Sequence, residues 1–411
     1  MKKNVLFVLF GAAILLTMNA CKSDASDLDE ELKFSKLTVE QQKAQIEKSG
    51  MDFVTAMEGM QDTKAITAIT NMLEMQGGDT EVYAPFQKLV SDIKKARKSS
   101  ISNLDKQMRV SYLDSEEWGE YVYNFETKEI EQIAELTNKL IVKFPSTESG
   151  TTNNVTLTVT YTDSNIEIPY VEEIEIEGEV YPSKITAVMT IDGAEVMSAD
   201  FSGKYYADGT PQEAIQSLTM ETYKWTAEIK NDKKTMSEAI EFKNGSTVIL
   251  KSSAELNGTL TEAALTTETP EDAITGFAVN FQVMNIAMKG GTTDFKKLVA
   301  EINALSEDLS EKEYVDKTTV ILNKYMIATA YFADNETKFA DLEFYGAEVT
   351  DTWEEWDYNQ QKNVTYTDTY YNLTPRFILS DGSKVAVEEY LEDGFSDLIT
   401  KIENLVEDFD Y

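Results

Sequence analysis

The sequence contains no histidine and only one cysteine, and these two absences exclude several classes of active site. Without an imidazole, the chain cannot build a Ser-His or Cys-His nucleophile, a histidine-ligated metal site or a histidine proton shuttle. Because Cys21 has no second cysteine to pair with, an internal disulfide and a cysteine-ligated zinc or iron–sulfur site are excluded as well. Glycine-rich phosphate-binding loops are also absent, so we expect no cofactor.

Positive charge is scarce. The 411 residues include 37 Lys and Arg against 73 Asp and Glu, which gives a net charge of −36. A chain of this charge repels phosphates, and no local basic stripe interrupts it, so nucleic acid is not an expected partner. Hydrophobic residues make up 42% of the chain and prolines number only 7, which is typical of a folded protein rather than a disordered one.

The N-terminus has the form of a targeting segment. Lys2 and Lys3 precede an apolar run from Val5 to Leu16, which is short for a membrane span, and the run ends at Met18-Asn19-Ala20-Cys21. This ending resembles the lipobox of bacterial lipoproteins, although Met18 stands where leucine is usual and Asn19 where a small residue is usual. The resemblance implies that residues 1–20 are removed and that Cys21 is diacylated, which is sufficient for stable membrane anchoring.

The segment after the cysteine is polar and acidic, and we interpret residues 21–36 as a tether. Lys22, rather than an aspartate, follows the cysteine, which is unlike the inner-membrane retention signal of two-membrane bacteria. The acidic run is similar to the surface-export signal of Bacteroidota lipoproteins, and a simple soluble spacer is the alternative. We therefore expect a lipid anchor in the outer membrane. The sequence does not decide between the cell surface and the periplasmic side.

Residues 37–110 are predicted to form a helical module. Thr38 fits a helix N-cap, with Gln41 three residues later to complete a capping box. A long amphipathic helix is expected further on, because apolar residues recur at helical spacing at Val82, Phe86, Leu89, Val90, Ile93, Ala96, Ile101, Leu104 and Met108.

From residue 111 the hydrophobic period changes to two, which indicates strands. Residues 111–290 are predicted to form an antiparallel β-rich domain, with hairpin turns at Asp192-Gly193 and Asn244-Gly245 and with single strands over 217–229 and 276–288. Residues 291–411 combine helical and alternating patterns. The predicted class is α+β, with an N-terminal helical module, a large antiparallel β-sheet or sandwich, and a C-terminal segment of strands with helices.

Aromatic residues are concentrated near the C-terminus. Six of the nineteen residues from 353 to 371 are aromatic, where the chain average of 10% would give about two. Such rings stack on sugars, and neighbouring carboxylates accept hydrogen bonds from sugar hydroxyls. The candidate ligand-binding residues are Trp353, Trp356, Tyr358, Glu354 and Glu355. The alternative is that the aromatic residues only form a cross-strand ladder that packs two strands together.

Evidence for catalysis or for a metal site is weak. Glu354 and Glu355 form a candidate carboxylate pair for glycoside hydrolysis, but acids are so abundant here that the pair assigns no catalytic residue. Asp163, Asn165 and Glu167 alternate like the first half of a calcium loop, yet Ile168 stands where such a loop requires glycine. We therefore expect a turn there and assign no metal site, while weak divalent cation binding by so acidic a chain is expected.

Taken together, these features resemble uncharacterised outer-membrane lipoproteins of Bacteroidota, a family from which no activity can be transferred. The interpretation is a non-catalytic binding or scaffold protein of the cell envelope, with the bilayer and a glycan or envelope protein as partners. Two alternatives stay open. One is a cofactor-free, carboxylate-based hydrolase that acts on glycans, and the other is a carrier of an apolar ligand inside a curled sheet.

Overall fold

The computed structural model describes residues 31–74, 118–167, 180–207, 209–261, 264, 270–292, 294–306, 308–357, 362–392, 395, 398 and 400–401. Several sequence predictions concern residues outside these ranges, namely the signal peptide, lipidation at Cys21, most of the tether, the amphipathic helix over 82–108 and the candidate site residue Tyr358.

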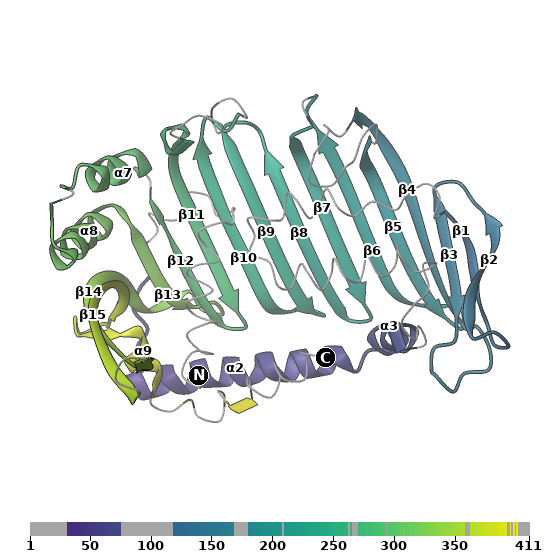
Figure 1. Ribbon diagram of the computed structural model, residues 1–411, viewed down its shortest axis with the longest axis horizontal. Coiled ribbons are helices and arrows are strands. Elements are labelled where there is room, and N and C mark those ends of the chain that lie inside the picture. The colour runs from purple at the N-terminus through teal and green to yellow at the C-terminus, as the bar shows by residue number, and fades with distance from the viewer. Residues whose placement is uncertain are drawn as a thin grey trace.

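The strands form one sheet of sixteen, in the order β16 to β3 followed by β1 and β2 (Figure 1). All neighbouring strands are antiparallel except β1 and β3, which run parallel. The strands are β1 (Gly119–Asn124), β2 (Glu129–Glu135), β3 (Lys139–Phe144), β4 (Val155–Glu167), β5 (Val180–Ile191), β6 (Ala194–Tyr205), β7 (Pro211–Met220), β8 (Tyr223–Asn231), β9 (Thr235–Asn244), β10 (Thr247–Gly258), β11 (Ile274–Val283), β12 (Ile286–Thr292), β13 (Ile327–Phe332), β14 (Thr337–Asp357), β15 (Lys362–Ile378) and β16 (Lys384–Ala386).

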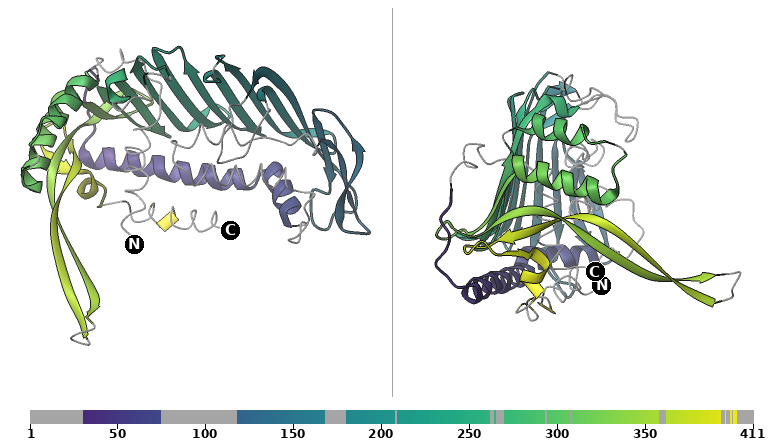
Figure 2. Two further views of the ribbon diagram at one scale, coloured as in Figure 1. Left: turned by 45° about the horizontal axis from the view of Figure 1, so that its top comes forward. Right: turned by 90° about the vertical axis from the view of Figure 1, so that its left-hand side faces the viewer.

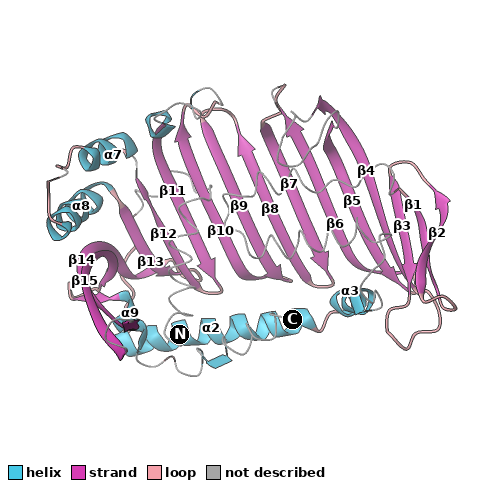
Figure 3. Ribbon diagram, viewed as in Figure 1, coloured by secondary structure: helices cyan, strands magenta, loops and turns pink. Residues whose placement is uncertain are grey.

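Helices are few beside this sheet, as Figure 3 shows. The described helices are α2 (Val39–Gln61), α3 (Lys64–Glu74), α7 (Phe295–Asn303), α8 (Glu311–Tyr325), α9 (Val387–Glu392) and the short 3₁₀ turn η6 (Pro270–Ala273). The protein is therefore mainly β rather than the balanced α+β that we expected. The two β-rich regions, 111–290 and 291–411, contribute to the same sheet. None of the described helices combines the length and the hydropathy needed to cross a bilayer.

The two faces of the sheet differ in polarity because side chains alternate along each strand. On one face, adjacent strands from β4 to β8 place apolar partners side by side, namely Leu157, Met189, Met197, Met220 and Tyr223. On the other face, the same pairing from β4 to β11 produces a polar row of Thr160, Thr186, Asp200, Ser217, Thr226, Glu241, Lys251 and Gln282. The sheet thus has an apolar face that must be covered and a polar face, on which no member of this row is buried.

Helix α2 crosses the strands near one of their ends (Figure 1) and connects two hydrophobic clusters. Met60 belongs to the cluster formed with α3 and strands β1 to β8 and β10, whereas Ile46 and Val54 belong to the cluster formed with β12 to β15 and α9. Phe53 and Met57 pack against both. Helix α2 therefore takes part in covering the apolar face at both ends of the sheet, together with α3 at one end and α9 at the other.

The N-terminus of α2 confirms the capping box predicted from the sequence. The Thr38 hydroxyl accepts a hydrogen bond from the Gln41 backbone N–H at 3.3 Å, and the Gln41 side chain accepts one from the Thr38 N–H at 3.0 Å. The two bonds satisfy backbone donors that the first turn of a helix leaves unpaired.

The hairpin turns are only partly those expected. Asp192-Gly193 and Asn244-Gly245 connect adjacent strands, as predicted, and both glycines have positive φ. The single strands predicted over 217–229 and 276–288 are wrong, because each is a hairpin. Glu221 and Met284 turn the chain there with φ of 52° and 50°, although neither residue type favours the left-handed region.

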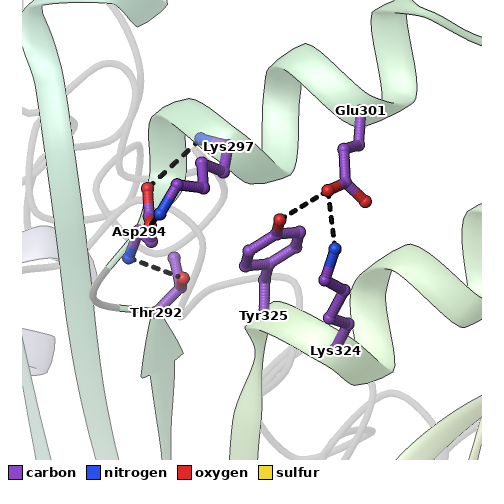
Figure 4. A network of polar contacts seen from close by, with 6 residues as sticks. All are labelled: Thr292, Asp294, Lys297, Glu301, Lys324 and Tyr325. Atoms are coloured by element: carbon purple, nitrogen blue, oxygen red, sulfur yellow. Dashed lines mark hydrogen bonds and ion pairs between the residues drawn. The ribbon is translucent and has the colours of Figure 1, made fainter.

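Two helices, α7 and α8, follow β12 and are joined by a polar network (Figure 4). Asp294 caps α7 by accepting from the Lys297 N–H at 3.4 Å, and its own N–H donates to the Thr292 hydroxyl at the end of β12. On α7, one oxygen of Glu301 accepts from Lys324 Nζ and from the Tyr325 hydroxyl of α8, both at 2.6 Å. The Glu301 contacts join the C-terminal end of α8 to α7.

Candidate functional site

Strands β14 and β15 continue far beyond the rest of the sheet and project from it as a two-stranded ribbon (Figure 2). Strand β13 pairs with β14 only as far as Asp341, and β16 pairs with β15 only from Ile378 to Arg376, whereas β14 and β15 pair with each other out to Asp357 and Lys362. We call residues 342–357 and 362–375 the ribbon. Its fifteen steps from Leu342 to Asp357 correspond to about 50 Å.

The base of the ribbon is fixed by α8. The Asn323 side chain donates to the carbonyl of Phe344 at 2.8 Å and accepts from the N–H of the same residue at 2.7 Å, so it takes the place of a neighbouring strand. Gly346 lies close against the helix, where an added Cβ would meet Asp316 and Val315 at 3.0 Å. A side chain larger than hydrogen at position 346 would push the two elements apart.

The outer half of the ribbon has water on both faces and carries large aromatic side chains. Trp353 and Tyr366 are direct partners across the two strands, and their rings stack with centroids 5.9 Å apart and planes at 23°. They are 46% and 40% exposed. By the strand register, three carboxylates share their face, namely Asp351, Glu355 and Asp368.

The candidate residues from the sequence are divided between the two faces of the ribbon. Trp353 and Glu355 lie on one face, and Trp356 and Glu354 lie on the other, because odd and even positions of a strand alternate. Trp356 is 49% exposed. Glu354 and Glu355 point to opposite sides of the ribbon and do not flank a common substrate position. Tyr366 completes the stacked pair. It could not be identified from the sequence, because only the strand register shows that it faces Trp353.

Hydroxyl groups line the ribbon between its base and its aromatic pair. Thr350 faces Thr369 and Thr352 faces Thr367, with oxygen atoms 3.4 and 3.5 Å apart. The Tyr370 hydroxyl donates to Asp351 at 2.8 Å, and this hydrogen bond raises the pKa of Tyr370. This bond ties Asp351 to β15 on the face of the ribbon that also carries Trp353. The ribbon is thus a polar support with one stacked aromatic pair.

No metal centre is seen among the described residues, in which no three acidic or cysteine side chains gather at one point. Asp163, Asn165 and Glu167 do not form the turn that we expected, because they lie within strand β4, which runs to Glu167.

A second polar feature lies on the apolar face of the sheet, and the sequence analysis missed it. Glu238 occupies an inward position of β9, directly between Ile229 of β8 and Ala254 of β10. Its side chain is 6% exposed, and Oε1 has no hydrogen-bond partner. Burial raises the pKa of this carboxyl to about 7. The signal was present in the sequence, since Glu238 is in phase with Met236, Ile240 and Phe242.

Comparison with known proteins adds no relative, since no protein-family model, curated protein or solved structure matches this chain. The candidate functional features are therefore the ribbon and the buried Glu238.

The buried position of Glu238 predicts a specific pH dependence of stability. Between its ordinary pKa of 4.5 and its folded pKa of about 7, the unfolded chain gives up this proton while the folded chain keeps it, so stability falls as pH rises. Glu238→Gln should remove that loss and make the protein more stable than the parent by up to about 3 kcal/mol at pH 8, with the difference vanishing near pH 4. Urea unfolding at several pH values measures this.

The matched control is Glu241→Gln, on the same strand but on the polar face, where Glu241 pairs with Lys243. It should produce no comparable gain at pH 8. Equal pH profiles for the parent and Glu238→Gln would show that Glu238 is not desolvated in the folded protein.

Proposed function

We propose that the protein is a non-catalytic, glycan-binding protein of the bacterial cell envelope, anchored in the outer membrane through acylated Cys21. The observation that carries the binding part is the stacked Trp353–Tyr366 pair, held on a projecting ribbon among carboxylates. The lipobox-like segment that ends at Cys21 supports the anchoring part.

The chemistry of the pair suits a sugar ring. The C–H face of a pyranose packs against an aromatic ring. The hydroxyls around the edge of the sugar then need hydrogen-bond acceptors from the protein. Asp351, Glu355 and Asp368 provide carboxylate acceptors on the same face of the ribbon. With a net charge of −36, the protein repels anionic polysaccharides, so the glycan is neutral or carries amino groups.

The shape of the ribbon favours a polymer. Trp353 and Tyr366 lie on an open two-stranded surface, and positions 351–356 and 366 are exposed. A long chain can cross such a surface at any point along its length, which suits recognition of internal sugar units rather than chain ends.

The tether enters the body of the protein beside the ribbon. The Ser35 N–H donates to the carbonyl of Lys338 at 2.7 Å, and the Lys338 N–H donates to the carbonyl of Lys33 at 3.0 Å. Lys338 lies at the beginning of β14, the strand that continues into the ribbon. A lipid anchor at Cys21 would therefore pull on the same end of the sheet that presents the aromatic pair.

The ribbon offers a matched pair of substitutions that tests glycan binding. Trp353→Ala removes the stacking platform and should weaken binding at least about tenfold, whereas Trp356→Ala, on the opposite face and equally exposed, should leave it within about twofold. Affinity electrophoresis in gels containing soluble xylan, mannan or laminarin measures this, with heparin as the anionic polymer that should not retard the protein. The proposal fails if no neutral polymer retards the parent, or if both variants lose retardation equally.

Cys21→Ser tests the anchor. The parent should incorporate labelled palmitate and sediment with the membranes of its host, because two acyl chains hold a protein on a bilayer. The variant should incorporate none and leave the membrane fraction. Membrane association that survives the substitution, or a parent that takes up no palmitate, would contradict lipidation at this residue.

A further inference from the structure

The outer edge of β15 is unpaired along most of the ribbon. Strand β16 pairs with β15 only from Arg376 onward, and no other described strand lies on that side. The contacts of α8 with the ribbon are at the edge of β14, through Asn323, and on one face, at Gly346. We call residues 363–374 of β15 the free edge. None of its side chains is buried.

Half of the backbone groups of the free edge point away from the ribbon. The Asn323 side chain bonds both the N–H and the C=O of Phe344, so these two groups point outward from β14. The direct partner of Phe344 is Pro375, and in an antiparallel ladder both members of such a pair direct their groups outward. Every second residue of β15 therefore presents an N–H and a C=O on its outer side, namely Leu373, Tyr371, Thr369, Thr367, Thr365 and Asn363.

The free edge lacks the usual protection against an added strand. Proteins protect an edge with lysine, proline, a bulge or a very short strand. The register of β15 with β14 runs without a bulge from Lys362 to Ile378, and the free edge contains one charged residue, Asp368. Eight of its twelve residues are β-branched or aromatic, which are the types that favour strands. The free edge is thus suited to β-strand addition.

The other open edges of the described sheet are acidic. The ribbon edge formed by β14 has four acids in the eight residues 348–355, and β2, at the opposite end of the sheet, has three glutamates in seven residues. A second copy of this acidic chain is repelled by both of these edges. The free edge is therefore the one at which two copies can meet.

We propose that the free edge pairs antiparallel with the free edge of a second copy, so that the protein is a dimer joined through its ribbons. A two-fold axis at Thr367 pairs residues 362–372 of both chains through about ten main-chain hydrogen bonds. The result is a four-stranded ribbon in the order β14, β15, β15, β14. Its outer edges are the acidic ones, which stop further addition and close the assembly at two copies.

The position of the axis follows from charge and from the ends of the free edge. With the axis at Thr367, Asp368 lies opposite Tyr366 of the copy. An axis at Asp368 would place two carboxylates directly opposite each other, and an axis at Thr369 would pair Asn363 with Pro375, which has no N–H to donate. Moving the axis towards the tip of the ribbon shortens the paired stretch.

Pairing stabilises the ribbon and keeps the two acidic bodies apart. A two-stranded ribbon is marginally stable in water, whereas a sheet of three or more strands is more stable. The net charge of −36 opposes association, but Thr367 lies eight residues from Pro375 at the base. The two bases are then sixteen residues of strand apart, or about 53 Å. Because the Debye length is about 8 Å at physiological salt, repulsion across this distance is largely screened.

The dimer needs no glycan, and one consequence of it rests on the proposed function. The two-fold axis is perpendicular to the four-stranded ribbon, so the two Trp353–Tyr366 stacks lie on the same face. A glycan polymer that contacts both stacks is held more tightly than one that contacts a single stack.

Sedimentation velocity tests the dimer on the full chain carrying Cys21→Ser, which has no acyl chains. This parent should show a monomer–dimer equilibrium between about 1 and 100 μM. The N–H of Thr367 points outward, so Thr367→Pro keeps the bonds between β14 and β15 and should weaken dimerisation at least about tenfold. The matched control is Thr352→Pro, whose N–H also points outward but from β14. It should change dimerisation by less than about twofold.

Cysteine crosslinking tests the axis itself in the same Cys21→Ser background, where the introduced cysteine is the only one. In Thr367→Cys the two Cα atoms are about 5.5 Å apart, within the range of a disulfide, and mild oxidation should produce covalent dimers on a non-reducing gel. In Thr352→Cys the two copies are three strand spacings apart, about 14 Å, and should stay unlinked.

The proposal is overturned if the parent stays monomeric over this concentration range, if the two proline variants have equal effects, or if both cysteine variants crosslink to the same extent. Association that weakens as salt is raised would also contradict it, because salt screens the repulsion between like charges. These measurements contain no glycan, so their failure is distinct from a failure of the Trp353→Ala test.

Discussion

The apolar face of a single sheet has to be kept from water, and in this protein one long helix contributes to this at both ends, beside α3 at one end and α9 at the other. A β-sandwich would solve the problem with a second sheet, but here every described strand belongs to one sheet. Helix α2 crosses the strands instead, placing Val54 in one cluster and Met60 in the other. Fully burying a side chain of this size contributes about 1.5 to 3 kcal/mol, so a helix that buries Ile46, Val54 and Met60 can join regions that are distant in sequence.

The ribbon is the part of the sheet that extends beyond its neighbouring strands. Beyond the base that α8 contacts, no described helix or further strand covers β14 and β15, and a two-stranded ribbon has little stability of its own. Cross-strand contacts such as the Trp353–Tyr366 stack and the paired threonines must support it, and Asn323 and Gly346 fix its base. The aromatic pair is thus both part of the structure of the ribbon and available to a ligand. Glu238 is an exception to the apolar pattern of this face, because it places a buried carboxylate where the fold requires an apolar residue.

Much of the local structure could be predicted from the sequence, because local rules govern it. The capping box at Thr38 and the glycine turns at 193 and 245 are examples. The hairpins at Glu221 and Met284 could not be predicted, since the pairing of the flanking strands forces positive φ on residues that rarely adopt it. Closeness in sequence groups Trp353 with Trp356, yet strand alternation separates them and brings Tyr366 to Trp353 instead. The single sheet could not be predicted either, because hydrophobic periodicity identifies strands but does not show which distant strands pair.

Hydrogen exchange measured along the full chain is the most direct test of the claim that α2 makes the sheet one folding unit. The amides of β4, in the cluster that contains Met60, and those of β13, in the cluster that contains Val54, should open with free energies equal to within about 1 kcal/mol. Val54→Ala, at a side chain that is fully buried, should lower both by the same amount, about 2 kcal/mol. If β13 loses protection while β4 keeps it, the two ends of the sheet unfold independently and α2 does not connect them.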